Sequence, residues 1–230
     1  MVARMSDMTP GKAPIARLVL ALGVAAACGG APAPASPPAS PTASAAASAQ
    51  AGAWAIADSS KATVRVREQL VGVSAPSDAV LVAKGAKGSF TLRDDGTFGS
   101  DSVISFDLTT LTSDQRQRDE TVKRDPLQVT RFSTAEFVPT KATGLTLPLA
   151  ASGDFSFTLV GKMTIHGTSK DVSFDVTAKR TGGDLTATAT ANPTWKFGDF
   201  GMSPPSSPLR VVSVVDEIKL VVDLVATLRS

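Results

Sequence analysis

Apolar and polar residues alternate through residues 155–178, and this periodicity constrains the fold more than any other feature of the sequence. Every second position is apolar or Gly in residues 155–165, and every second position is apolar in residues 172–178. Successive side chains of a β-strand point to opposite faces, so a period of two predicts strands with one buried face. Residues 167–169, Gly-Thr-Ser, lie between the two runs and predict the hairpin turn that joins them.

The same alternation recurs elsewhere in the chain. Residues 104–108 carry apolar side chains at every second position, and so do residues 218–228, where the apolar set runs from Ile218 to Leu228. Charged residues make up only 19% of the sequence, while Val, Thr and Ala are abundant, which favours half-buried strands over long charged helices. Because a single barrel routinely reaches about 200 residues, the sequence predicts one all-β domain after the N-terminal segment.

Residues 184–192 form a strand of a different kind. Its predicted inward face carries Leu185, Ala187, Ala189 and Ala191, so this face has little bulk. Protein interiors are closely packed, and a track of small residues must therefore face either a bulky wall or an enclosed space. The pattern alone leaves both readings open, since phenylalanines of residues 155–174 are available to fill the gap.

Several short motifs follow one another along the chain in the order found in one family, and the sequence therefore resembles the YceI-like lipid-binding proteins. The resemblance covers the chain from about Trp54 to Ser230. The motifs that carry it are the strand end Thr164, Ile165, His166 and Gly167, the turn Thr168, Ser169 and Lys170, the triplet Asp199, Phe200 and Gly201, the closing strand with Asp216, and a middle motif of Leu111, Thr112, Arg118, Asp119 and residues 132–137. The resemblance implies a closed antiparallel lipocalin-like β-barrel of about eight strands with a short helical segment.

The same resemblance implies a non-catalytic function: binding, storage or transport of a long-chain isoprenoid or similar amphiphilic lipid inside the barrel. That lipid is the expected ligand and no cofactor is expected. The expected cavity residues are Phe106, Phe155, Phe157, Phe174, Ala187, Ala189, Phe197, Phe200 and Met202. The last three lie in a Gly-rich and Pro-rich loop. There they either line the cavity mouth or fill the end of the barrel as core, and the resemblance favours the first.

A polar helical segment after Thr112 carries the candidates for contact with the lipid head group, namely Arg116, Arg118 and Asp119. The alternative for these residues is an ordinary solvated helix face. A homodimer is a further expectation. The alternative for the whole domain is a membrane-tethered β-sandwich that acts as an adhesion or interaction module without a lipid cavity, because alternation alone does not separate a sandwich from a barrel.

The N-terminal residues predict export. Three basic residues precede an apolar run at residues 18–27, which is too short to span a bilayer and is followed directly by Cys28, the only cysteine. This segment resembles a bacterial lipobox, whose cysteine becomes the acylated first residue; an ordinary secretion signal with an incidental cysteine is the alternative. We interpret residues 1–27 as the signal, residues 28–52, rich in Ala, Pro and Ser, as a flexible tether, and residues 53–230 as the barrel. The expected location is the cell envelope, periplasmic or outer surface, with membrane contact through the anchor, or alternatively secretion.

Other classes of function lack support in the sequence. His166 is the only histidine, and the sequence has no G-x-S-x-G elbow, no H-E-x-x-H and no cluster of metal-ligating residues, so neither a catalytic nor a metal site is expected. We interpret His166 as a solvent-facing turn residue and Trp195 as a structural one. With 23 basic against 21 acidic residues and no basic run, the chain also lacks the charge pattern of a nucleic-acid-binding protein.

Overall fold

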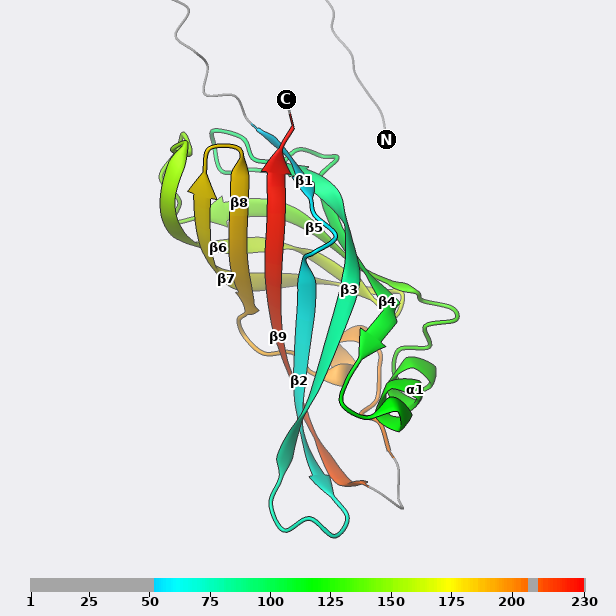
Figure 1. Ribbon diagram of the computed structural model, residues 1–230. Coiled ribbons are helices and arrows are strands. Elements are labelled where there is room, and N and C mark those ends of the chain that lie inside the picture. The colour runs from blue at the N-terminus through cyan, green and yellow to red at the C-terminus, as the bar shows by residue number, and fades with distance from the viewer. Residues whose placement is uncertain (1–51, 207–210, 230) are drawn as a thin grey trace, which may run out of the picture. The chain divides into compact units, whose positions relative to one another are not determined.

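The computed structural model describes residues 52–206 and 211–229. Within them the chain forms nine strands, one helix and one 3-10 turn (Figure 1). The strands are β1 (Ala53–Ile56), β2 (Lys61–Leu70), β3 (Ser77–Thr91), β4 (Val103–Thr112), β5 (Thr134–Thr143), β6 (Ser152–Ile165), β7 (Thr168–Thr181), β8 (Asp184–Ala191) and β9 (Val211–Leu228). The helix is α1 (Arg116–Arg124) and the 3-10 turn is η1 (Phe197–Phe200).

The sheet closes on itself to form a barrel. All neighbouring strands are antiparallel and follow the order β3-β2-β9-β8-β7-β6-β5-β4, and the pairing of β3 with β4 completes a ring of eight. The short strand β1 pairs with both β3 and β9 at one end of the barrel, beyond the start of β2. Closure removes exposed sheet edges. The expected closed barrel is confirmed, and the β-sandwich architecture is not the one that the chain adopts.

The faces of the strands follow the sequence periodicity. On β8, Leu185 and Ala191 are buried and Ala187 and Ala189 are half-buried, while the three threonines between them are exposed. On β7 the four apolar positions of residues 172–178 are all buried. Leu228 is an exception: the periodicity predicts that it faces inward, but 36% of it is exposed because it is the last residue of β9, at the end of the barrel.

The hairpin between β6 and β7 turns one residue earlier than predicted. Ile165 pairs directly with Thr168, so His166 and Gly167 alone form the turn, with φ values of 52° and 73°. Positive φ at both central residues is typical of a two-residue hairpin turn. Thr168, Ser169 and Lys170, which the sequence motif assigned to the turn, belong to β7 instead. The tight turn keeps all fourteen positions of β6 in register with β7.

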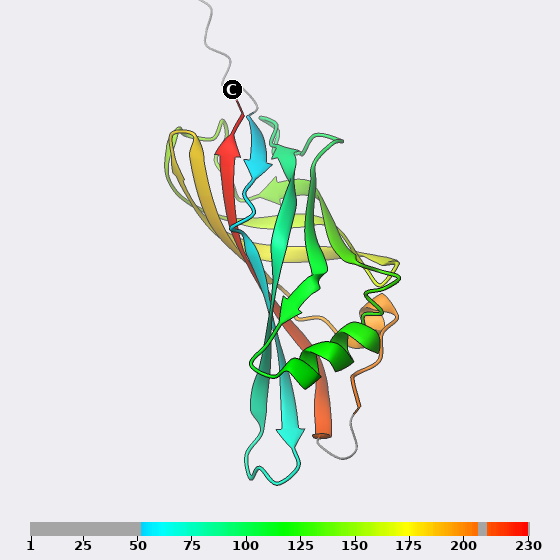
Figure 2. The same cartoon turned by 45° about the vertical axis from the view of Figure 1, so that its right-hand side comes forward.

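The two ends of the barrel differ. The strand β1 and the end of β9 lie together at one end, whereas α1 and the long β2–β3 hairpin lie toward the other (Figures 1 and 2). Trp54 and Phe90 stack at the first end with ring centroids 6.2 Å apart, and Phe98 packs edge-on against Phe90. The first end is therefore packed with aromatic side chains, while the second carries the polar helix.

Candidate ligand-binding cavity

An apolar cavity of about 250 Å³ occupies the inside of the barrel, and every strand contributes to its lining. Along β9 its wall runs from Val214 to Leu224, ten residues apart, which at about 3.3 Å per residue is roughly 33 Å. That length is close to the roughly 30 Å hydrocarbon thickness of a bilayer. Among the described residues that line the cavity, only Glu68 and Arg118 carry a charge. The shape and chemistry fit a long apolar ligand better than a compact polar one.

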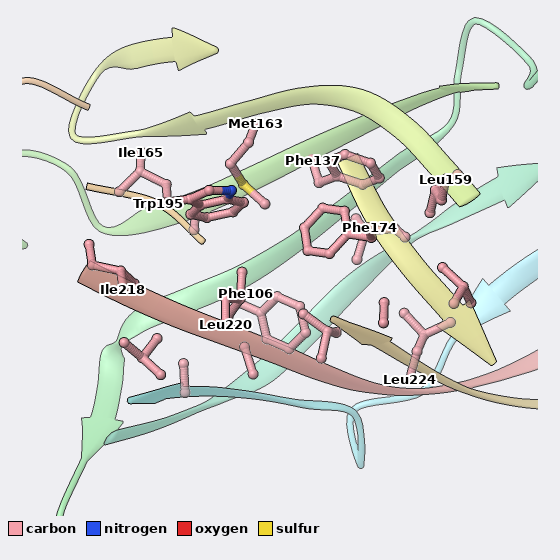
Figure 3. A pocket seen from close by; sticks show the side chains of 18 of the residues that line it. Phe106, Phe137, Leu159, Met163, Ile165, Phe174, Trp195, Ile218, Leu220 and Leu224 are labelled. Atoms are coloured by element: carbon pink, nitrogen blue, oxygen red, sulfur yellow. The ribbon is translucent and has the colours of Figure 1, made fainter. Parts of the chain in front are cut away.

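All nine residues expected to form the cavity wall line it. They are Phe106, Phe155, Phe157, Phe174, Ala187, Ala189, Phe197, Phe200 and Met202. Figure 3 shows Phe106 and Phe174 pointing into the same space, with leucines of β6 and β9 around them. The two alanines come from β8, and Ala62, Ala79 and Ala83 of β2 and β3 also line the cavity. Thin alanine walls leave room that the phenylalanines do not fill, so the small-residue track of β8 faces an enclosed space.

A chain of aromatic rings crosses the cavity wall. Phe174 packs edge-on against Phe137 at 5.3 Å and against Trp195 at 5.8 Å, and Trp195 lies 5.1 Å from Phe200. Gly161 makes room for the first ring, since a Cβ at this position would lie 2.6 Å from the ring of Phe137. Such offset arrangements favour fixed ring positions. The rings therefore form a preorganised wall.

Sequence reasoning overlooked two members of this wall. Phe137 shares its strand face with Ala135 and Pro139, both of which also line the cavity, so the alternation of β5 was a usable signal. Trp195 was interpreted as structural. It is indeed buried and bridged to Ile218 through backbone hydrogen bonds of 3.0 and 2.7 Å, but its ring also lines the cavity (Figure 3).

The Asp-Phe-Gly triplet places two phenylalanines in the barrel. The Asp199 carboxylate accepts a hydrogen bond from the Lys196 amide at 2.9 Å and forms an ion pair with Lys170 of β7. Asp216 of β9 accepts a hydrogen bond from the Phe197 amide at 2.8 Å. The hydrogen bond from Lys170 and that from the Lys196 backbone hold the pKa of Asp199 below its ordinary value. Two carboxylates thus tie η1 to β7 and β9, so Phe197 and Phe200 stay buried against the cavity.

One end of the cavity is polar. Arg118 of α1 donates a hydrogen bond to Glu68 of β2 at 2.6 Å and also pairs with Asp114. Only 12% of the Arg118 side chain and 7% of the Glu68 side chain are exposed. Burial alone would lower the pKa of Arg118, but its hydrogen bonds and ion pairs with Glu68 and Asp114 raise it above its ordinary value. The guanidinium is therefore a fixed positive group at the polar end.

The other two head-group candidates do not reach the cavity. The Arg116 side chain is 91% exposed and pairs with Glu120 one turn along the helix. It points away from the cavity because residues two apart on a helix, such as Arg116 and Arg118, point in different directions. Asp119 is buried, yet its carboxylate accepts hydrogen bonds from the amide and hydroxyl of Ser113 at 2.8 and 2.6 Å. It fastens the start of α1. Of the three candidates, only Arg118 lies on the cavity wall.

A second, smaller cavity of about 70 Å³ adjoins this polar end. It shares five lining residues with the main cavity, namely Glu68, Arg118, Val122, Pro205 and Val214. Polar side chains of α1, of its N-cap residue and of the segment between η1 and β9 add to its lining, namely Gln117, Thr121, Gln115 and Ser206. The apolar barrel interior therefore continues into a chamber with hydrogen-bonding groups.

His166 differs from its interpretation as a solvent-facing residue. Its ring packs edge-on against Phe132 with centroids 4.7 Å apart, and its Nε2 is buried with no hydrogen-bond partner in the described part of the chain. The turn of the backbone presses the ring against Phe132, whose ring also lies beside Gly167. His166 is thus a packing residue outside the cavity lining.

Some predicted features lie outside the described residues. Cys28, the signal segment and nearly all of the tether are among them. Within residues 52–206 and 211–229, no helix has the length and apolar character needed to cross a membrane. The same residues contain no group of three or more His, Cys, Asp or Glu arranged to hold a metal ion.

Comparison with solved structures shows the same fold elsewhere. A polyisoprenoid binding domain from Saccharophagus degradans superposes with a TM-score of 0.58 at 12% identity, covering 77% of this chain and 99% of that domain. BcnA from Burkholderia cenocepacia superposes with a TM-score of 0.53 at 17% identity, covering 73% of this chain and 96% of its own. At these identities the likeness concerns the fold alone.

Sequence comparison points to the same group of proteins. A UPF0312 protein of Pseudomonas putida is 32% identical over 131 residues, which are 51% of this chain and 65% of the relative, slightly less than two thirds of its length. A UPF0312 protein of Pseudomonas fluorescens is 30% identical over 138 residues, or 54% of this chain and 68% of the relative. The YceI-like domain model matches residues 54–226. Since this match spans nearly the whole described barrel, the chain belongs to the YceI-like domain family.

Proposed function

We propose that the protein binds a long-chain isoprenoid or a similar amphiphilic lipid inside its barrel and stores or transports it without chemical change. The observation that carries the proposal is the apolar cavity, whose wall extends roughly 33 Å along β9 and is thinned by alanines of β2, β3 and β8. The structural neighbour from Saccharophagus degradans, a polyisoprenoid binding domain, supports the same ligand class.

The energetics favour an apolar tail as the main source of affinity. Burying a methylene contributes about 0.8 kcal/mol, and association costs roughly 4 to 15 kcal/mol, so a buried tail of about ten carbons contributes about 8 kcal/mol and exceeds the lower estimate of this cost. The cavity lining contains only two charged side chains among the described residues, which leaves few groups to desolvate. Affinity therefore depends on tail length more than on any polar contact.

The two ends of the cavity suggest how the lipid is oriented. The tail points toward the aromatic end with Trp54 and Phe90, where only apolar groups face the cavity. The head group lies at the polar end beside Arg118, whose position is held by Glu68 and Asp114. The adjoining chamber with Gln115 and Thr121 offers further hydrogen-bonding partners.

The finer parts of the proposal concern location. Several acyl chains on Cys28 would hold the protein at the cell envelope, close to the membranes that contain such lipids. One acyl chain binds membranes only marginally, whereas several bind firmly, so membrane fractionation in a bacterial host measures the anchoring. Metabolic labelling with a radioactive fatty acid detects the acyl chains themselves. We expect label on the wild type and none on Cys28→Ala; an unlabelled wild type would remove the anchor from the proposal.

The lipid itself is tested by native mass spectrometry of protein purified without detergent from a bacterial host. We expect a population with added mass that organic extraction removes and that tandem fragmentation identifies as an isoprenoid or a related long-chain amphiphile. Mixing the extracted protein with a long-chain polyprenol should restore an adduct of the corresponding mass. A protein that neither carries nor takes up such a molecule would refute the proposed function.

A further inference from the structure

Exposed valines gather at one end of the barrel. Five large apolar residues are exposed in the described part of the chain, and four of them lie on the tip of the β2–β3 hairpin and the first residues of β9. They are Val71, Val73, Val212 and Val215, exposed by 53%, 46%, 66% and 47%, and we call them the valine tip. Residues 70–77, Leu-Val-Gly-Val-Ser-Ala-Pro-Ser, contain no charge. A grouped apolar surface of this kind indicates an interaction site, whereas a single exposed valine would not.

The valine tip adjoins the polar end of the cavity system. Leu70, next to Val71, pairs with Val211, next to Val212, and both residues line the smaller cavity. Val214, next to Val215, lines both cavities. The tip lies at the end of the barrel away from β1 and the end of β9 (Figures 1 and 2). The smaller cavity thus lies between the valine tip and the apolar interior.

The size of the tip decides between a membrane and a second protein. A fully buried valine side chain removes at most about 120 Å² from water, so four half-exposed valines offer roughly 250 Å². A stable protein interface needs about 800 Å² from each partner. A bilayer has no such requirement, because a few apolar side chains inserted between head groups suffice for a transient contact.

The bound ligand gives a second reason to favour a membrane. A long lipid tail loses about 0.8 kcal/mol per methylene when it passes into water, so exchange through water is slow. An apolar tip beside the cavity would let the tail pass from bilayer to barrel with little exposure. We propose that the valine tip inserts into a lipid bilayer surface and that the lipid enters and leaves the barrel at this end. The route of the lipid rests on the proposed function, whereas the membrane contact does not.

The N-terminal chain is long enough for this orientation. Residues 29–52 separate Cys28 from Ala53, and covalent geometry allows 24 residues to span at most about 80 Å. The longest strand, β9, has 18 residues and measures roughly 60 Å. An anchor at Cys28 would therefore permit the valine tip to meet the same membrane, although it lies at the opposite end of the barrel from Ala53.

The route is tested by lipid uptake from two sources. The full chain is stripped of lipid and mixed with phosphatidylcholine vesicles or with detergent micelles, each containing a radiolabelled long-chain polyprenol. We compare the wild type, the triple variant Val71→Ser/Val73→Ser/Val212→Ser, and Leu228→Ser, which changes the fifth exposed apolar residue at the other end. We expect the triple variant to take up lipid from vesicles at least tenfold more slowly, with unchanged uptake from micelles, while Leu228→Ser matches the wild type. Equal vesicle rates in both variants would overturn the route.

The membrane contact is tested without reference to the cavity. Val73→Trp and Leu228→Trp place a reporter at either end, and both retain the buried native residues Trp54 and Trp195 as a common background. Vesicles of brominated phosphatidylcholine should quench the added fluorescence of Val73→Trp and not that of Leu228→Trp. Equal quenching of the two variants would overturn the membrane contact. It would also be overturned if the wild type sediments as a dimer and the triple variant as a monomer, because the valine tip would then be a protein interface. A wild type that takes up no lipid from either source refutes the proposed function, and quenching still decides the membrane contact.

Discussion

Filling the alanine wall should displace the ligand without unfolding the barrel. Ala189 of β8 is half-buried, faces the cavity and pairs with Val176 and Val222, which also line it. The change Ala189→Phe adds a ring about the size of benzene. A cavity of about 150 Å³ accommodates benzene, so one ring takes more than half of the roughly 250 Å³ available here.

The expected magnitude follows from this fit. In a packed core, the same substitution would destabilise the protein by about 1 to 3 kcal/mol through overpacking. Inside a cavity the ring gains apolar contacts, so we expect the lipid-free variant to unfold within about 1 kcal/mol of lipid-free wild type. Because the ring and the tail compete for the same volume, retained lipid should fall at least tenfold.

The assay combines native mass spectrometry of the purified protein with urea unfolding of stripped samples. The matched control is Thr190→Phe, which adds the same ring to the exposed face of the same strand, next to Ala189 in sequence. The control should keep its lipid. If Ala189→Phe unfolds the domain, or retains as much lipid as the control, the reasoning that assigns the ligand to this space is wrong.

Three further predictions concern residues around the cavity. Arg118→Met leaves the Glu68 carboxylate buried without its partner and should destabilise the protein by about 3 to 5 kcal/mol in urea unfolding. The double variant Glu68→Met/Arg118→Met should recover most of this loss. A double variant as unstable as the single one would contradict the pairing. The lowered pKa of Asp199 means that its ionised form contributes stability above the unfolded-state value of about 3.9, and this contribution is lost as pH falls through the lower folded-state pKa. The difference in unfolding free energy between wild type and Asp199→Asn should therefore be constant above about pH 5 and shrink below about pH 4, and a difference independent of pH would refute the assignment. His166→Ala removes one ring contact with Phe132 and should cost no more than about 1.5 kcal/mol with unchanged lipid content; a large loss of lipid in the folded variant would give the histidine a ligand role.

Residues near the polar end show the limit of local patterns. Arg116, Arg118 and Asp119 are similar candidates in the sequence, since all are polar groups on one short helix. Their roles separate only when Glu68, fifty positions away along the chain from Arg118, supplies the ion pair that holds one of them against the cavity. Asp119 is instead committed to Ser113. No spacing within the helix contains this information, because the partner comes from β2.

The turn between β6 and β7 shows a limit of another kind. Gly167, Thr168 and Ser169 all have residue types common in turns, and the pattern does not choose among them. The pairing of β6 with β7 decides, because placing Ile165 opposite Thr168 satisfies the backbone hydrogen-bonding groups of both strands to their ends. His166 then takes a positive φ and packs on Phe132, a contact that links β6 to the loop before β5.

By itself, the sequence determined the inward faces of the clearly alternating strands β4, β6, β7, β8 and β9, apart from Leu228 at the end of β9, because a period of two is a local property of the backbone. Its motif order also indicated the family and the antiparallel barrel. Only the tertiary structure decided that the ring closes between β3 and β4 and that the alanines of β8 face an enclosed space. The side chains that lie across the cavity come from strands far apart in the chain: Ala189 pairs with Val222, while the phenylalanines that share its cavity include Phe106 of β4, Phe137 of β5 and Phe174 of β7. Periodicity identifies an inward face, but only the assembled barrel determines whether that face meets a side chain or a space.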